Sequence, residues 1–438
     1  MKKIFNFIFK LIFGAFASLI IFLTLKLLIP VERIELEYPN KGRWETHQRI
    51  DFISAEECGL CHQEIYNQWK SSGMANATVS SMLEFKLHEI SLSMRGYPSE
   101  DVEWCYQCHA PLALTSPKDL TLSDPISRSG VTCIVCHTTV QAIPDSNAGN
   151  LFLEPRLKMN GPFADVISNF HESNQHTLFS DENSDLCASC HFSVYPRNNM
   201  PIDWTWKEWY ESENDQSCKQ CHMPEYSGIS ANRDWVPERK LRKHTFPGGG
   251  MYNPEFIKTA ATLVTNYNSE RNVLDISITN NCGHNFPTGN GSAPALELRV
   301  LSKLDQSLIY REYFKNSYIG YLGIEVLDPT IAISKGVDSS IPAYQVINRQ
   351  INLKEYSQEN LITVYLIFHY WLPFEKNNQV QAGMKTVFNY LLLPEVDIVT
   401  VVNTLRKKEI WQILSQLTKV NPKPNYLVDR QQIKIIGS

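Results

Sequence analysis

The chain has 438 residues, of which 43% are hydrophobic and 20% are charged. At roughly 150 residues per domain, this length predicts two or three folded units, and the composition excludes fibrous and disordered classes of protein. The 41 basic and 46 acidic side chains give a formal net charge of −5, which argues against a nucleic acid as partner.

The amino terminus has the pattern of a membrane anchor. Lys2 and Lys3 precede a mostly apolar stretch over 4–29, and about 20 apolar residues span a bilayer as a helix. The alternative is a cleaved signal peptide, but no small-residue cleavage site follows the stretch. We therefore expect residues 1–30 to form one uncleaved transmembrane helix in a bacterial cytoplasmic membrane. Because lysines favour the cytoplasmic side, the bulk of the chain is then expected in the periplasm.

Cysteine spacing is the strongest signal in the sequence. Ten of the eleven cysteines fall in five copies of the motif Cys-x-x-Cys-His, whereas chance predicts roughly 0.01 copies in a chain of this composition. In chain order, the cysteine pairs are Cys58 and Cys61, Cys105 and Cys108, Cys133 and Cys136, Cys187 and Cys190, and Cys218 and Cys221. Five copies far exceed the number expected by chance, so the motif serves a function.

The motif spacing is that of covalent haem attachment. Two intervening residues let one short turn present both sulfurs to the same edge of a porphyrin, and the adjacent histidine then reaches the iron. The pattern predicts five covalently bound haem c groups in a domain over 31–255, built mostly of short helices and loops. An exported location agrees with this chemistry, whereas a cytosolic zinc or thioredoxin-like site leaves the histidines unexplained. The proximal ligands would be His62, His109, His137, His191 and His222.

The residue on the far side of each iron decides the chemistry. A second strong ligand makes a haem an electron carrier, and an open position lets it bind a small molecule. The candidate distal ligands are His171, His176, His244, His284 and Met74; His47 and His88 are weaker candidates. For each of them the alternative is an ordinary surface or core residue. If helical, His171 and His176 point in different directions and would serve different haems.

From about residue 262 the pattern changes to strands. The segments 272–279, 295–300 and 361–370 alternate or run apolar between turn-rich stretches, which predicts an immunoglobulin-like β-sandwich over 262–438. An amphipathic segment over 396–417 predicts a helix near the end. His284 either reaches into the haem domain as an axial ligand or sits in a hairpin turn. The eleventh cysteine, Cys282, is expected to be a buried reduced thiol, and His369 in a strand is expected to be structural.

Residues around the motifs carry a family resemblance. They are Trp69 with Ser71 and Ser72 after the first motif, Ala110-Pro111 after the second, Gly130 before the third, Gly161-Pro-Phe with His171, Leu186 before the fourth motif, Trp206-Lys-Glu-Trp209 and Met223-Pro224 around the fifth, and His244-Thr-Phe-Pro-Gly-Gly. In this order, the region 54–250 resembles multihaem cytochromes of the cytochrome c-554 type, which are periplasmic electron carriers.

The resemblance has consequences for the ligands. It implies that His171 and His244 are distal ligands, and Gly283–Gly289 looks like a Gly-His-x-x-Pro-Thr-Gly element of β domains appended to such proteins. One departure concerns the segment after Trp69, where the family often has a histidine and this chain has Gly73–Asn76. Either Met74 substitutes, or another residue reaches over, or one haem is open.

These observations favour one function and leave another open. The first is a membrane-anchored periplasmic carrier that relays electrons between periplasmic or membrane redox proteins. The alternative is an oxidoreductase in which one open haem acts on a small nitrogen, sulfur or oxygen species. The C-terminal β region is compatible with either function as a docking platform for a partner.

Overall fold

The computed structural model describes residues 41–78, 100–147, 149–154, 158–248, 254–289, 294–302, 306–326, 329–356, 362–369 and 426–433, with Tyr38 and a few residues between 13 and 24. Most of the anchor predicted at 1–30, and the whole helix predicted at 396–417, lie outside these residues. Among the described residues, no helix is both long and apolar enough to cross a bilayer.

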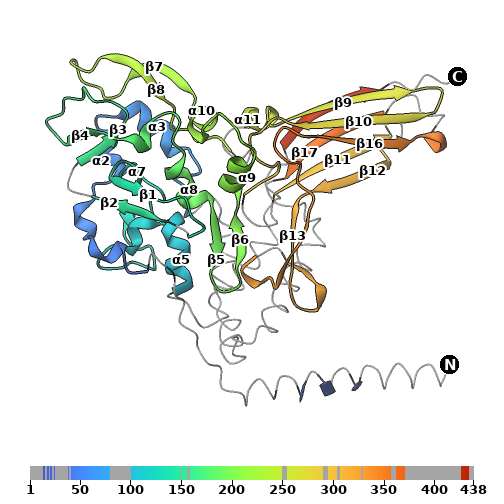
Figure 1. Cartoon of the computed structure of the whole chain (residues 1–438), viewed down its shortest axis with the longest axis horizontal. Helices are drawn as coiled ribbons and strands as arrows, with labels where there is room; N and C mark the ends of the chain where they lie inside the picture. The colour runs from blue at the N-terminus through green and yellow to red at the C-terminus, as the bar shows by residue number, and fades with distance from the viewer. Residues whose placement is uncertain are drawn as a thin grey trace.

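The amino-terminal region is built from short helices, and each Cys-x-x-Cys-His motif lies in or beside one of them (Figure 1). One turn of helix is sufficient because it places the two cysteines, three residues apart, on the same face. The helices that carry the motifs are α2 (Ala55–Gly59) with α3 (Gln63–Lys70), α5 (Glu100–His109), α7 (Cys133–His137), α8 (Asp185–His191) and α10 (Cys218–His222). The remaining helices are α6 (Pro125–Arg128), α9 (Thr205–Glu211) and α11 (Pro254–Lys258).

The same region contains more sheet than the sequence predicted. Four two-stranded sheets connect the helices: β1 (Thr139–Ala142) with β2 (Leu151–Leu153), β3 (Lys158–Gly161) with β4 (Glu172–Gln175), β5 (Ser193–Tyr195) with β6 (Met200–Asp203), and β7 (Glu225–Ile229) with β8 (Glu238–Arg242). Pairing of three to five residues between distant segments leaves little periodicity in the sequence, so these ribbons escaped prediction.

The carboxyl-terminal region is a β-sandwich, and the predicted β-rich region is confirmed. One sheet has the order β16 (Val346–Asn352), β10 (Val273–Asn280), β9 (Ala261–Asn268). The other has the order β12 (Leu308–Phe314), β11 (Ala295–Ser302), β17 (Ile362–His369), β18 (Tyr426–Ile433). The chain crosses from one sheet to the other and back, as Greek-key sandwiches do.

Alternating side chains of the facing strands form the core of the sandwich. In β10, Leu274, Ile276 and Ile278 are buried, while the residues between them are partly exposed. They belong to one apolar cluster with Leu298 of β11 and Leu366 of β17. The three predicted strands match β10, β11 and β17. β10 alternates because one of its faces is buried, whereas β17 runs apolar because it is buried along nearly its whole length.

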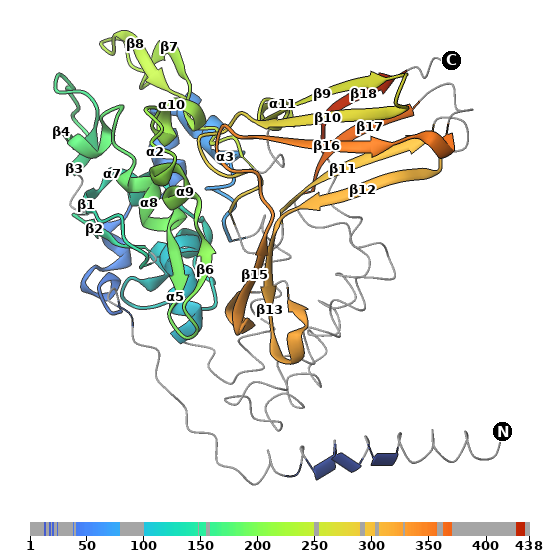
Figure 2. The ribbon, with the colours of Figure 1, turned by 45° about the vertical axis from the view of Figure 1, so that its right-hand side comes forward.

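The sandwich and the helical region lie side by side (Figure 2). A small sheet of β13 (Asn316–Ile319), β14 (Glu325–Val326) and β15 (Ser334–Asp338) extends from the sandwich toward the β5–β6 ribbon. There the hydroxyl of Tyr318 donates to the carbonyl of Pro201 at 2.8 Å, and the amide of Asn198 donates to the carbonyl of Pro329 at 2.8 Å. These contacts fix the β region against the region that carries the motifs.

Candidate haem-binding site

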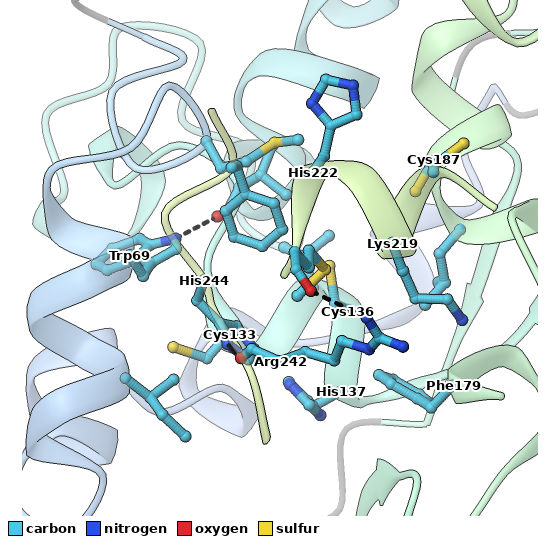
Figure 3. Close-up of a pocket in the computed structure, with 18 of the residues that line it drawn as sticks. Trp69, Cys133, Cys136, His137, Phe179, Cys187, Lys219, His222, Arg242 and His244 are labelled. Carbon is cyan, nitrogen blue, oxygen red and sulfur yellow. Dashed lines mark hydrogen bonds between the residues drawn. The ribbon is translucent and has the colours of Figure 1, made fainter. Parts of the chain in front are cut away.

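One continuous cavity runs through the helical region and reaches the sandwich. Its volume is about 1750 Å³, and it is lined by all ten motif cysteines and all five motif histidines. Figure 3 shows the part of its wall where Cys133, Cys136, His137 and His244 lie. The indole N–H of Trp206 also lines the cavity, and it is buried without an acceptor among the described residues. A space lined by every attachment residue, with a buried donor left over, fits covalently bound haem groups.

Local capping fixes the motif helices. The Ser54 hydroxyl accepts from the backbone N–H of Glu57, whose carboxylate accepts from the N–H of Ser54, and this reciprocal cap begins α2. Ser217 and Gln220 form the same arrangement at α10. Because a cap satisfies backbone donors that an isolated turn leaves free, it stabilises a helix of only one turn.

The outer ring nitrogens of four motif histidines face backbone carbonyl groups. The Nδ1 atoms of His62, His109, His137 and His222 lie 2.6, 3.1, 2.7 and 2.6 Å from the carbonyl oxygens of Ser230, Ala77, Asn160 and Pro247. A carbonyl oxygen only accepts hydrogen bonds, so each Nδ1 carries the proton and Nε2 keeps a lone pair. Metal-ligating histidines usually have this outer hydrogen bond. These four histidines are therefore in the tautomer that can bind a metal through Nε2.

Three of these histidines face a second histidine across the cavity. The ring centres of His62 and His171 lie 6.2 Å apart, those of His137 and His244 6.3 Å, and those of His222 and His284 6.3 Å. Two nitrogens bonded to one metal at about 2 Å are about 4 Å apart, and each ring centre lies about 1 Å further out. The expected separation of about 6 Å agrees with all three pairs. Each pair is spaced to hold one iron.

The three opposing histidines have the same outer hydrogen bond as the motif histidines. Their Nδ1 atoms lie 3.1, 2.9 and 2.8 Å from the carbonyl oxygens of Glu172, Arg242 and Asn285. Burial lowers the pKa of His244 to about 4, and burial with the neighbouring His284 lowers the pKa of His222 to about 4. These rings are therefore neutral at physiological pH, which is the form that binds a metal.

Cysteines of different motifs lie next to one another. Cys133 raises the pKa of Cys58, Cys218 raises the pKa of Cys187 and Cys108 raises the pKa of Cys190, so the thiols of each pair lie near one another. Cys136 lies close enough to Cys190 for a charge there to raise its pKa, although burial is the larger cause. By these proximities the first motif lies near the third, the third near the fourth, and the fourth near both the second and the fifth.

The comparisons with known proteins agree with this geometry. Residues 57–138 match the model of a family described as cytochrome c554 and c-prime. The fold is similar to that of a penta-heme cytochrome c552 from Thermochromatium tepidum, with a TM-score of 0.63 and 20% identity over 88% of this chain and 100% of that one. The search of curated proteins gave no match. The chain is a multihaem c-type cytochrome.

The resemblance predicted from the sequence is thus confirmed. The cytochrome brings His171, His244 and His284 to the cavity, but it does not bring His176 there. His176 instead accepts a hydrogen bond at Nδ1 from the backbone N–H of Leu178 at 3.3 Å and caps a short 3-10 helix. The structure therefore gives no support to a ligand role for His176, because its ring takes part in this cap and does not line the cavity.

The remaining candidates have different surroundings. Met74 lines the cavity, and its carbonyl accepts from the N–H of Val131 at 3.0 Å beside the third motif. His47 packs edge-on against Phe52 and does not line the cavity, and His88 lies outside the described residues. His369 is buried in the sandwich with Nε2 2.6 Å from a carboxylate oxygen of Glu297, in agreement with the predicted structural role.

Two contacts of motif residues could not be found by sequence reasoning. The fourth motif histidine, His191, has its Nδ1 3.0 Å from Oδ2 of Asp203, a carboxylate where the other four have a carbonyl. Although burial alone would lower the pKa of His191, the charge and hydrogen bond of Asp203 raise it to about 9. Lys219, inside the fifth motif, is buried and its ammonium donates to the carbonyl of Leu178 at 3.1 Å. Both contacts join residues that are separated in the sequence, so no local sequence motif indicates them.

Proposed function

We propose that this cytochrome carries five covalently bound haem c groups and relays electrons between redox partners. The observation that carries the proposal is the spacing of the three histidine pairs, at 6.2, 6.3 and 6.3 Å between ring centres. Two strong axial ligands favour fast electron exchange and prevent a haem from binding other molecules. Three of the five sites would have histidine at both axial positions, and this arrangement suits electron transfer better than the binding of a substrate.

Each haem would be held by thioether bonds to the two cysteines of a motif and by Nε2 of its histidine. His171 would complete the site of the first motif, His244 that of the third and His284 that of the fifth. When bound, the haem groups supply iron that alternates between the ferric and ferrous states. The chain keeps the ligand nitrogens unprotonated and excludes water with the apolar walls of the cavity.

The contacts between cysteines support a continuous relay. Because the sulfurs of the first and third, third and fourth, second and fourth, and fourth and fifth motifs are neighbours, the edges of the attached haem groups would be neighbours as well. Electrons would then enter at one end of the set and leave at another, with the fourth site as the junction. We further propose that residues 1–30 anchor the chain and that its periplasmic bulk meets soluble or membrane redox proteins.

The test of this proposal uses the full-length protein. A haem assay should give five groups per chain, and electron paramagnetic resonance of the oxidised protein should show low-spin signals from at least three. A stepwise reductive titration should reduce and reoxidise all five reversibly. Fewer than five covalent haem groups, or a majority of high-spin signals, would contradict the relay. Membrane fractionation of cells that express the full chain or a chain starting at residue 31 tests the anchor.

A further inference from the structure

Glu208 of α9 is a buried carboxyl group that the haem sites do not use. It is only 8% exposed, and it is not among the residues that line the cavity. Haem groups in the cavity would therefore leave its immediate surroundings in place. Within the described part of the chain, its carboxylate forms no ion pair, and its direct hydrogen-bond partner is the hydroxyl of Thr288. A carboxyl in such a place is costly to ionise, because burial disfavours the charged form.

The charges that face Glu208 act mainly in the same direction. Burial is the largest cause that raises the pKa of Glu208 to about 7; the negative charges of Asp203 and Asp338 also raise it, and Lys335 opposes them. Lys335 pairs with Asp338 at 3.1 Å, so much of its charge is engaged there. Burial, with the charges of these acidic groups, raises the pKa of Tyr318, and its phenol stays neutral. Glu208 is therefore balanced between its two protonation states near neutral pH.

A series of hydrogen-bond contacts joins Glu208 to the histidine of the fourth motif. The hydroxyl of Thr288 donates to a carboxylate oxygen of Glu208 and lies 3.1 Å from the hydroxyl of Thr205. The backbone N–H of Thr205 donates to Oδ1 of Asp203 at 2.9 Å. The other oxygen of Asp203, Oδ2, lies 3.0 Å from Nδ1 of His191. The carboxyl and the histidine thus belong to one connected polar cluster.

The other four motif histidines have no such connection on their outer side. Their Nδ1 atoms face backbone carbonyl groups, which carry no net charge and do not titrate. At His191 the outer partner is a carboxylate whose own charge acts on Glu208. The fourth site is therefore the one at which a change of charge on the iron would be felt by a buried group that can bind a proton.

Reduction changes the charge at the haem end of this cluster. An electron added to the iron makes the site more negative by one charge, and a carboxylate nearby then binds a proton more tightly. Charges in the interior are weakly screened, so the effect extends beyond direct contact. Linkage requires the reverse effect as well: a proton bound at Glu208 makes the same iron easier to reduce.

We propose that Glu208 couples electron transfer at the fourth haem to the uptake of one proton. The ferric haem held by His191 accepts one electron from a neighbouring haem and becomes ferrous, while the carboxylate of Glu208 takes one proton from water and becomes a carboxylic acid. On reoxidation the electron passes to the next haem and the proton returns to water, so the charge of the site balances at each step. This inference rests on the haem occupancy of the proposed function and adds proton binding to the relay at its junction.

The first experiment follows the five midpoint potentials of the full-length protein by spectroelectrochemistry from about pH 6 to about pH 9. One potential should fall as the pH rises through about 7, by up to a factor of ten in the reduction equilibrium per pH unit, which is 59 mV for one electron. E208Q should lose this fall. E211Q is the matched control, because Glu211 is exposed on the same helix and pairs with Lys207. An equal pH dependence in E208Q and the natural protein would overturn the proposal.

A further variant tests which haem is coupled. D203N removes a negative charge beside His191, so it should raise the midpoint potential of the same haem that loses its pH dependence in E208Q. If the two variants act on different haem groups, the coupling to the fourth site is wrong.

A second measurement detects the proton itself. Reduced-minus-oxidised infrared spectra near pH 7 should show the carbonyl stretch of a newly protonated carboxyl, which E208Q lacks and E211Q keeps. T288V, which retains Glu208, should move this proton uptake to higher pH, because the hydroxyl bond that favours the carboxylate is lost. A band that persists in E208Q, or an unmoved pH range in T288V, would overturn the proposal. Five haem groups that reduce reversibly would still support the relay in that case.

Discussion

The outer nitrogen of each histidine decides its role in this cytochrome. Where Nδ1 donates to a carbonyl, as in His137 and His244, Nε2 has a lone pair that points into the cavity. Where Nδ1 accepts, as in His176, the proton must be on Nε2 and the ring cannot bind a metal in that state. Two histidines five residues apart, His171 and His176, therefore serve different purposes.

The first prediction concerns single distal histidines. H244A and H284A should each convert one low-spin haem to a ligand-binding haem, because alanine removes the second axial nitrogen and leaves the covalent attachment intact. The gain is one additional carbon monoxide per chain in the reduced protein, measured by difference spectroscopy. H176A is the matched control and should leave the spectrum as it is. A new ligand-binding haem in H176A, or none in H284A, would refute the assignment.

Individual residues show most clearly how much of the site can be predicted from the sequence. The ten cysteines and five motif histidines follow from covalent chemistry, which requires a fixed spacing within five residues. The partner of each motif histidine is set by the path of the whole chain, so the pairing of His62 with His171 or His222 with His284 needed the structure. Asp203 gave no signal at all, since its contact with His191 depends on the β5–β6 ribbon between them.

At the scale of elements, the loop Gly283–Gly289 joins the two regions of the molecule. On the sandwich side, the amide of Asn280 donates to the carbonyl of His284 at 2.8 Å. On the haem side, the hydroxyl of Ser212 donates to the carbonyl of Gly283 at 2.8 Å, and Thr288 bonds to Glu208 of α9. The loop is therefore held from both sides while it presents His284 to the cavity.

The second prediction tests that loop through a glycine. A Cβ atom at Gly283 would collide with the side-chain amide of Asn214, so G283A should displace the loop and weaken or remove the bond of His284 to the fifth haem. We expect a new ligand-binding haem with all five groups still attached. The double variant G283A/N214A should recover the low-spin spectrum, because the colliding amide is gone. Failure of N214A to rescue would show that steric contact is not the cause.

The third prediction concerns pH at the same junction. Burial raises the pKa of Glu208 to about 7, well above its ordinary 4.5, so folding favours its protonated form. The protonated carboxyl should contribute up to roughly 3 kcal/mol to the free energy of unfolding. This contribution should be complete below about pH 4.5 and lost as the pH rises through about 7. Thermal unfolding between pH 5 and 8 should therefore depend on pH less steeply in E208Q.

A control for this effect lies on the same helix. Glu211 is exposed and pairs with Lys207, so E211Q should keep the pH dependence of the natural protein. If E208Q and the natural protein lose stability equally over this range, the titrating group is elsewhere.

At the scale of the whole molecule, the two regions have different kinds of core. The sandwich has a closed apolar cluster in which Leu274, Leu298 and Leu366 are fully buried. The helical region surrounds a cavity of about 1750 Å³, and apolar side chains such as Ile167 and Phe170 line it. Filling this space with porphyrin surface would bury these side chains and extend the apolar cluster that the helical region has around Trp104 and Tyr195.

The fourth prediction follows from that difference. Protein produced without haem should keep the sandwich folded and lose the structure of the helical region, because the apolar cluster of the helical region borders the open cavity while that of the sandwich is closed. Limited proteolysis with mass spectrometry should then give a protected fragment that begins near residue 261. The haem-loaded protein is the control and should be protected in both regions. Equal protection of both regions in the haem-free protein would contradict the prediction.

The pairing of the histidines has a consequence for how the protein matures. In each of the three pairs the distal histidine comes later in the chain than its motif, and the last of them, His284, comes from the sandwich. A chain that emerges amino end first thus offers these three attachment sites before their distal histidines exist. Each new haem would stay accessible to the attachment machinery, and completion of the sandwich would seal the fifth. Chains that end before residue 284 should accordingly carry five haem groups with the fifth still reactive.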